Sequence, residues 1–316
     1  MAIEWYPKQA PVQGLTGLWG GTQGALTSGS SEQLPFLGGR AVWMCGYSGG
    51  GTNNAEYVSI ESGANTSDFG DMQQARWGAT GTSNGTRGLC SGGGNSPSYG
   101  IDYITISSTG NASAFGNLTA NRRDTSGVSN GDKSVIFGGY SPGDTVLDYV
   151  SFDTTGNATS FGNAADSGYG AGPCSNGTYG CFIEGNDISG AQYITIATTG
   201  NSTMFQNSWP YDGSGSAGGS GDTDNDRGIS SYGSAISYFT ISTLSSGASF
   251  GTNNSGSSGT YISGASDGTK FVFGGANGNN TISYVNIAST GNSSTFGNYG
   301  SGNGAYYRSC TSGDPS

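Results

Sequence analysis

Short hydrophobic stretches recur along the chain at a constant distance, separated by segments rich in Gly, Ser, Asn and Thr. One copy reads DYITISSTGNASAFGNL at 102–118, and another reads DYVSFDTTGNATSFGNA at 148–164. Each begins with β-branched and aromatic residues, which favour a strand, and continues through a Gly-Asn turn to a second aromatic residue. The pattern therefore predicts pairs of short antiparallel strands that repeat along the sequence.

The repeat has a period close to 45 residues. Six tyrosines, spaced by 46, 46, 44, 45 and 46 residues, align with one another: Tyr57, Tyr103, Tyr149, Tyr193, Tyr238 and Tyr284. Twelve residues after each of them stands a phenylalanine: Phe69, Phe115, Phe161, Phe205, Phe250 and Phe296. A fixed period of this length is typical of a four-stranded propeller blade, so the sequence predicts six blades.

Each unit divides into four predicted strands, as residues 122–164 illustrate. A first strand at 124–129 is followed by an Asn-Gly turn, which favours a tight hairpin, and by a second strand at 133–138. The third strand carries DYVSF, and the fourth surrounds Phe161. The first strands contain mainly small residues, as in GATGTSNG at 78–85, so we expect them to line the crowded central axis.

The two ends of the repeat complement each other. The chain enters at a second strand, GRAVWMCGY at 39–47, with no first strand before it. It finishes with YYRSCTSGD at 306–314, which aligns with 124–132 and places Cys310 at the position of Val128. We expect this last segment to complete the first blade and close the ring. The predicted fold is thus an all-β, six-bladed propeller over residues 39–316.

The unit resembles the kelch repeat in four features. A basic residue precedes the first strand at Arg76 and Arg122, and Gly-Gly doublets close second strands at 92–93, 138–139 and 274–275. A Tyr in the third strand and an aromatic residue in the fourth complete the resemblance, which implies a kelch-like propeller. The unit departs from the kelch pattern in having Phe where Trp is usual, and in the replaced doublets EG and YG.

The regular repeat sequence is also similar to the repeats of Gly-rich, kelch-like proteins of bacteriophages, especially marine ones. Such proteins are commonly associated with the virion or its tail. The similarity implies a non-enzymatic structural protein of a virion, as a decoration, tail or fibre component that contacts the host surface. The alternative is a free-standing, lectin-like propeller that binds carbohydrate.

Composition and charge narrow the classes of partner. Glycine makes up 61 of the 316 residues, but 18 Tyr, 13 Phe and 5 Trp supply enough aromatic area for a core. The net charge of -11 disfavours nucleic acid as a partner, because its phosphates would be repelled. Apolar runs are too short for membrane insertion. No basic segment followed by an apolar one suggests a signal peptide, so we expect synthesis in the host cytoplasm and a final location in the virion.

Cysteine, histidine and carboxylate positions disfavour an enzyme. The sequence contains no histidine, which excludes Ser-His-Asp and Cys-His catalysis. Its carboxylates are scattered, so we nominate no catalytic or cofactor-binding residue. The five cysteines lack CxxC spacing and are expected to be small buried residues: Cys45, Cys90, Cys174, Cys181 and Cys310. Cys174 and Cys181 flank an SNGT turn, and only one hairpin register would allow them to form a disulfide.

Two local segments are candidate binding sites. In GDTDNDRG at 221–228, Asp222, Asp224 and Asp226 alternate as in calcium-binding loops, although Arg227 takes the place of the usual Gly. The alternative is an enlarged acidic surface turn. Trp209 and Tyr211, in an irregular WPY segment, are the best candidates for stacking on a sugar. Trp77 and Tyr232 are weaker candidates, because they are also suited to packing between blades.

Residues 1–38 lie outside the repeat and are too apolar for a solvated tail. Their large apolar side chains are Trp5, Tyr6, Leu15, Leu18 and Trp19. We expect the segment to be an anchor through which the propeller binds another virion subunit. The alternative is a strap that packs on the first or last blade.

Overall fold

The computed structural model describes residues 34, 36–94, 99–140, 145–210, 217–221, 226–254, 261–275, 279–300 and 306–313. The chain divides into two units, Met1–Ser31 and Glu32–Ser316, and every described residue belongs to the second. The described residues form strands and turns and include no helix, so a membrane-spanning helix is also absent from them.

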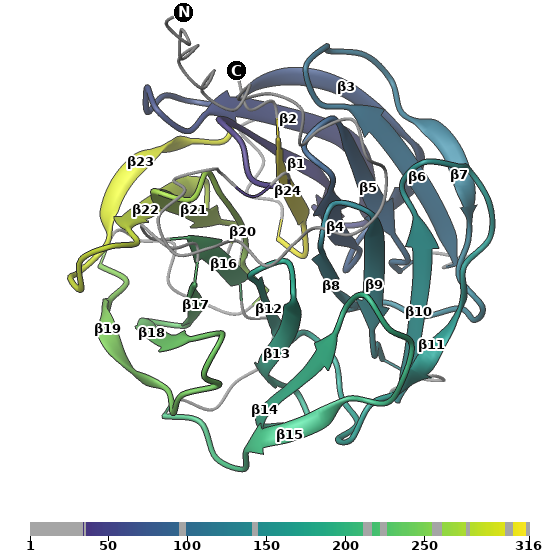
Figure 1. Cartoon of the computed structure of the whole chain (residues 1–316). Helices are drawn as coiled ribbons and strands as arrows, with labels where there is room; N and C mark the ends of the chain where they lie inside the picture. The colour runs from purple at the N-terminus through teal and green to yellow at the C-terminus, as the bar shows by residue number, and fades with distance from the viewer. Residues whose placement is uncertain are drawn as a thin grey trace, which may run out of the picture. The chain divides into compact units, whose positions relative to one another are not determined.

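The described strands form six antiparallel sheets of four strands each (Figure 1). In spatial order, the first sheet contains β24 (Ser309–Gly313), β1 (Arg40–Tyr47), β2 (Gly51–Ser59) and β3 (Ser67–Arg76), and the second contains β4 (Thr80–Ser83), β5 (Arg87–Ser91), β6 (Gly100–Thr105) and β7 (Ser113–Asn117). The third contains β8 (Ser126–Ser129), β9 (Lys133–Phe137), β10 (Val146–Ser151) and β11 (Thr159–Asn163), and the fourth contains β12 (Gly172–Ser175), β13 (Tyr179–Gly185), β14 (Ile188–Thr195) and β15 (Thr203–Gln206). The fifth contains β16 (Ala217–Gly221), β17 (Arg227–Tyr232), β18 (Ala235–Thr240) and β19 (Ala248–Thr252), and the sixth contains β20 (Ser263–Ser266), β21 (Lys270–Gly274), β22 (Thr281–Asn286) and β23 (Ser294–Asn298).

The sheets are arranged around a common axis as the blades of a propeller, which confirms the predicted fold (Figure 1). The first strand of each blade faces the axis, and the fourth strand lies at the rim. Apolar residues pack between neighbouring blades, as where Phe137 of the third blade stacks on Phe182 of the fourth with ring centroids 4.6 Å apart. The core is therefore distributed around the ring.

The repeated Tyr and Phe form one edge-to-face pair in each blade. Tyr149 in β10 and Phe161 in β11 have ring centroids 6.0 Å apart, and the other five blades hold the same pair at 5.8 to 6.2 Å. A cation from the second strand covers the Tyr ring in most blades, as Arg87 covers Tyr103 at 4.7 Å. The constant twelve-residue interval in the sequence therefore reflects cross-strand packing between the two outer strands.

The C-terminal strand closes the ring, as predicted. β24 pairs with β1 from Arg40 opposite Gly313 to Met44 opposite Ser309. The predicted alignment is wrong by one residue, because Ser312 takes the position expected for Thr311. Its hydroxyl donates to the carbonyl of Ser266 at 2.7 Å, and a shift by one residue would turn that hydroxyl to the other face of the sheet.

A row of serines at the end of the inner strands joins neighbouring blades. The Ser129 hydroxyl donates to the Ser83 carbonyl at 2.7 Å, and the Ser175 hydroxyl donates to the Ser129 carbonyl at 2.8 Å. The Ser129 hydroxyl also accepts the N–H of Gly131 in the following turn at 2.9 Å. Each serine thus links its own hairpin to the preceding blade, which explains why SNG recurs at this turn.

The recurring Gly-Asn turn between the outer strands makes a second link, at the rim. Asn157 Oδ1 accepts the backbone N–H of Asn117 in the preceding blade at 3.0 Å, and equivalent bonds involve Asn65, Asn111, Asn201 and Asn292. Gly116 is required beside this contact, because a Cβ there would lie 1.9 Å from the carbonyl oxygen of Gly156. The Asn of these turns therefore has a structural role between blades.

Buried ion pairs join the segment before the inner strand to the third strand in each of the first three blades. Arg76 contacts Asp102 at 2.7 Å and Arg122 contacts Asp148 at 2.6 Å. Arg308, which precedes the closing strand β24, contacts Glu56 at 3.0 Å. Arg308 does not align with Arg76 and Arg122 in the repeat, yet it contributes to the first blade the same buried cation that the next two blades receive.

All five cysteines are buried and have free thiols. Cys174 and Cys181 lie directly opposite each other on β12 and β13, but the Cys174 thiol donates to the carbonyl of Ile229 in the next blade at 3.3 Å. Cys45 and Cys90 meet between the first two blades with their sulfur atoms 3.7 Å apart. The cysteines therefore fill space between strands and blades, as expected.

Candidate functional site

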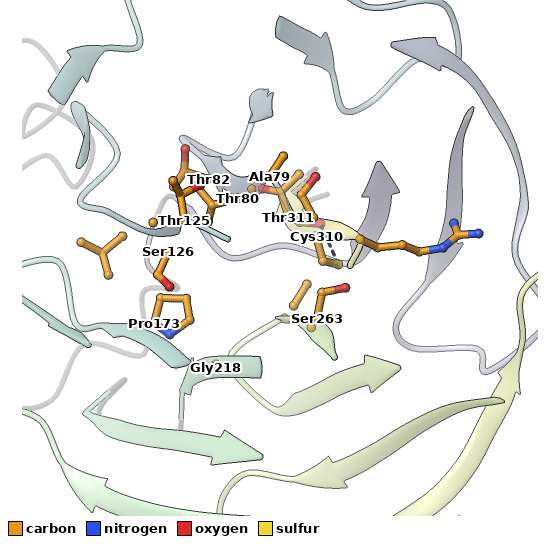
Figure 2. Close-up of a pocket in the computed structure, with 18 of the residues that line it drawn as sticks. Ala79, Thr80, Thr82, Thr125, Ser126, Pro173, Gly218, Ser263, Cys310 and Thr311 are labelled. Atoms are coloured by element: carbon orange, nitrogen blue, oxygen red, sulfur yellow. Dashed lines mark hydrogen bonds between the residues drawn. The ribbon is translucent and has the colours of Figure 1, made fainter. Parts of the chain in front are cut away.

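The inner strands of the six blades enclose a cavity of about 160 Å³ along the propeller axis. Its walls consist mainly of Gly, Ala, Ser and Thr, as Figure 2 shows for Thr80, Ser126 and Ser263. Six strands converge on the axis, and their small side chains do not fill the space between them. This lining confirms the prediction that the first strands lie at the axis.

Apolar residues occupy the cavity end where the serine turns lie. Phe36 and Leu37 line the cavity, and together with Leu34 they form a buried cluster. Leu34 and Phe36 lie beside the turn at Gly177, 3.5 and 3.7 Å from where its Cβ would be. A ligand that enters the cavity along the axis would therefore use the opposite end.

A ring of backbone hydrogen bonds surrounds that opposite end. Two positions before five of the inner strands, the residue adopts a left-handed backbone with φ between 55° and 67°: Gly78, Asp124, Gly170, Tyr261 and Tyr307. The equivalent residue before β16 lies outside the described residues. Four of these N–H groups donate to the corresponding carbonyl of the preceding blade: Gly78 to Tyr307 at 2.8 Å, Asp124 to Gly78 at 2.6 Å, Gly170 to Asp124 at 2.7 Å and Tyr307 to Tyr261 at 3.3 Å. This ring holds the cavity entrance in a fixed shape.

Aromatic residues and one arginine extend outward from this entrance, where Tyr261 and Tyr307 line the cavity, through a series of ring contacts. We call this group the aromatic mouth: Tyr47, Trp77, Arg123, Tyr140, Tyr169, Tyr261, Tyr306 and Tyr307. Tyr261 stacks on Tyr307 with ring centroids 3.6 Å apart, and Trp77 contacts Tyr307 at 4.9 Å. Tyr140 is 46% exposed, the only large hydrophobic residue that is exposed in the described part of the chain.

Arg123 is held between two of these rings. Its guanidinium lies 4.5 Å from the centroid of Trp77 and 4.4 Å from that of Tyr140. A guanidinium between aromatic faces gains cation–π stabilisation and keeps a defined orientation. The mouth therefore combines apolar ring surface with a planar hydrogen-bond donor.

Asp124 is a buried carboxylate at the cavity entrance. It is 8% exposed and lines the cavity, and its Oδ2 lies 3.5 Å from Nε of Arg123. Among the described residues, none donates a hydrogen bond to its Oδ1. Burial raises the pKa of Asp124 to about 7, and the charge of Arg123 offsets only part of that rise. The ionised form therefore lacks the hydrogen bonds that normally accompany a buried charge.

Replacing Asp124 with asparagine should stabilise the protein at alkaline pH. Because its pKa is higher in the folded chain than the ordinary 3.8, the wild type loses stability as the pH rises from about 4 to about 7. The neutral amide avoids this loss, so the variant should be more stable by roughly 4 kcal/mol at about pH 8 and similar to the wild type near pH 4. Urea denaturation at both pH values measures the difference, and equal stability at about pH 8 would contradict the expectation.

The proposed calcium ligands are only partly described. Asp222 and Asp224 lie outside the described residues, so calcium binding stays a prediction. Asp226 Oδ1 accepts the backbone N–H of Ser242 at 2.7 Å and the amide of Asn176 at 3.0 Å. Within the described residues, no cluster of three His, Cys, Asp or Glu side chains could hold a metal ion.

Of the two sugar-stacking candidates, Trp209 is described and Tyr211 is not. Trp209 is buried, its ring contacts Phe239 edge to face at 5.5 Å, and its Nε1–H donates to the Ser237 hydroxyl at 2.9 Å. The anchor residues Trp5, Tyr6, Leu15, Leu18 and Trp19 also lie outside the described residues. Of the four aromatic candidates considered from the sequence, Trp77 belongs to the mouth.

Most residues of the mouth were not nominated from the sequence, although the repeat contains a signal for them. Trp77, Arg123 and Tyr169 are spaced by 46 residues, as are Tyr261 and Tyr307. These residues immediately precede the inner strands, so the repeat brings them to the same end of the axis. The signal is aromatic enrichment at two adjacent loop positions of the repeat, rather than a local motif.

Comparison with known proteins leaves the family open. The sequence matches no protein-family model, and a search of curated proteins finds no match.

Proposed function

We propose that the protein is a non-enzymatic, carbohydrate-binding propeller and that the aromatic mouth is its recognition surface. The observation that supports this function most directly is the continuous series of seven aromatic residues and Arg123 that begins at Tyr261 and Tyr307, which line one end of the cavity. Aromatic rings that are both apolar and able to hydrogen bond suit a ligand with C–H faces and many hydroxyl groups. Sugars combine these two properties.

The size of the cavity indicates how such a ligand would be held. Its volume of about 160 Å³ is smaller than the roughly 300–1,000 Å³ of pockets that enclose a drug-sized molecule. The cavity therefore suits one end of a glycan, while the rest of the chain would lie across the mouth. The exposed ring of Tyr140 is placed to contact that outer part.

The distribution of carboxylates supports binding rather than catalysis. Glu56, Asp102 and Asp148 are buried in ion pairs with arginines. The sequence also contains no histidine that could serve as a general base. Among the described residues that line the cavity, Asp124 is the only carboxylate, whereas glycoside hydrolysis ordinarily needs two on opposite sides of the bond.

A structural role in a phage virion is the second candidate, and it is compatible with the first. It is supported by the kelch-like sequence of the repeat and by the division of the chain into residues 1–31 and the propeller unit. In this role the first segment would attach the propeller to a virion subunit, and the mouth would face the host surface. Mass spectrometry of purified particles tests it: a fixed ratio to capsid or tail proteins supports the role, and recovery only as free protein contradicts it.

Replacing Tyr140 with alanine should weaken glycan binding by roughly tenfold or more, because the variant removes an exposed ring and one face of the Arg123 sandwich. A glycan array identifies ligands of the wild type, and titration calorimetry then compares the variant with it. Tyr179→Ala is the matched control, since Tyr179 lies next to a serine turn at the opposite end of the axis. Failure of the wild type to bind any glycan, or equal binding by Y140A, would contradict the proposed function.

A further inference from the structure

We propose that Arg123 and Asp124 form a polar subsite that binds two neighbouring hydroxyl groups of the terminal sugar residue. The Arg123 guanidinium donates to one hydroxyl, and the Asp124 carboxylate accepts a hydrogen bond from the other. The inference rests on the proposed function, since it names the part of the glycan that the mouth recognises.

The two side chains offer a donor and an acceptor that are not yet used. Arg123 Nε and Asp124 Oδ1 are buried and, among the described residues, have no hydrogen-bond partner. Nε and Oδ2 are 3.5 Å apart, which is too long for a direct hydrogen bond. Adjacent hydroxyl groups of a sugar ring are separated by about one hydrogen-bond length, so one hydroxyl can accept from the guanidinium while its neighbour donates to the carboxylate.

Both side chains are held in place before a ligand binds. The Arg123 guanidinium lies between the rings of Trp77 and Tyr140. Asp124 is fixed through its backbone, which donates to Gly78 and accepts from Gly170. Restricting the side chains in advance lowers the entropy that binding would otherwise cost.

The position of Asp124 is unfavourable for the fold. Its backbone has a φ of 55°, its charge is buried, and Oδ1 lacks a partner among the described residues. The second and fourth blades place glycine on either side of it in the ring, at Gly78 and Gly170, so the ring does not need a side chain here. Gly78 itself leaves room for the carboxylate, because a Cβ there would lie 2.3 Å from Oδ1. Costly features that the fold does not need are typical of binding sites.

The surrounding groups make the subsite sensitive to pH. The charged or titratable side chains that interact with Asp124 are Arg123, Tyr169 and Tyr307, and Tyr261 stacks on Tyr307. Burial raises the pKa of both Tyr169 and Tyr307, so neither changes charge near neutral pH. Asp124 is therefore the group that titrates in this range, and its ionised form is the better acceptor for a hydroxyl.

The experiment measures the affinity of the best glycan from the array by titration calorimetry at about pH 8, where Asp124 is ionised. Asp124→Gly and Arg123→Met should each weaken binding roughly ten- to a hundredfold, since each removes a hydrogen bond to a charged group. D124G introduces the residue that two neighbouring blades carry at this position, so it should fold. Asp132→Asn, an exposed acidic residue in a serine turn, is the matched control and should bind like the wild type.

Deoxy analogues of the terminal sugar complete the test. Removing the hydroxyl that contacts Asp124 should weaken binding to the wild type and leave binding to D124G unchanged. The wild type should also lose affinity between about pH 8 and about pH 6, whereas D124G should not.

The outcomes separate this inference from the proposed function. If the wild type binds a glycan and Y140A does not, but D124G binds within about twofold of the wild type, the subsite is wrong and the binding function stands. If the wild type binds no glycan, the proposed function and the subsite both fail.

Discussion

Replacing Asp148 with alanine should lower the free energy of unfolding by about 3–5 kcal/mol, because it leaves the buried guanidinium of Arg122 without its counter-charge. Asp148 and Arg122 are both fully buried at their side chains, and their atoms Oδ2 and Nη2 are 2.6 Å apart. The same carboxylate accepts the backbone N–H of Thr119 at 2.9 Å and its hydroxyl at 2.8 Å. Burial alone already lowers the pKa of Arg122, and Asp148 counteracts this effect.

Urea denaturation monitored by tryptophan fluorescence measures this change. Asp132→Ala, which removes an exposed carboxylate from the same blade, should alter stability by less than about 0.5 kcal/mol. A double variant, Arg122→Met with Asp148→Leu, should recover much of the loss, because it removes both buried charges together. A loss below about 1 kcal/mol for D148A would show that Arg122 finds other compensation, such as the carbonyls of Gly138 and Val146 that it already contacts.

Deleting residues 306–316 should remove most of the stability of the propeller. The deletion takes away β24, which pairs with β1 along its length, and the Arg308–Glu56 ion pair. It also removes the Ser312 hydroxyl that binds the Ser266 carbonyl of the sixth blade. Since a domain of this kind has a net stability of roughly 5–15 kcal/mol, loss of one inner strand and both of its blade contacts is comparable with the whole.

Calorimetry should show that the truncated chain has lost the cooperative transition of the full chain, and light scattering should show aggregation through the uncovered edge of β1. A second deletion, of residues 314–316 only, serves as the control, because it leaves β24 intact. Unfolding of the longer deletion within a few degrees of the full chain would mean that ring closure contributes little to stability.

Much of the architecture could be predicted because each blade is specified by its own short segment of sequence. The Tyr-to-Phe interval indicates a cross-strand pair, and the Asn-Gly turns indicate hairpins. The small residues of the first strand indicate that this strand lies at the axis. These contacts lie within one period or between adjacent periods, so they leave a regular trace in the sequence. The same regularity placed the C-terminal segment in the first blade, although one residue out of register.

The candidate site could not be predicted in the same way. Tyr47 ends β1, Trp77 lies between β3 and β4, Tyr140 follows β9 and Tyr307 precedes β24, and only Trp77 among them is a candidate from the sequence. Arg308 likewise looked unrelated to Arg76 and Arg122, but the closing strand brings it to the equivalent carboxylate. Such residues share no local pattern, because they meet only when the ring closes.

The sequence alone therefore determined the number of blades, the order of strands and the composition of the axis, since each follows from interactions between residues that are close along the repeat. The tertiary structure decided which loop residues surround the cavity, which end Phe36 and Leu37 occupy, and that Asp124 is buried without a full set of hydrogen bonds. Burial and hydrogen bonding of a side chain depend on what the neighbouring blades place around it. For Asp124, those neighbours are the ring residues Gly78 and Gly170 and the tyrosines of the mouth.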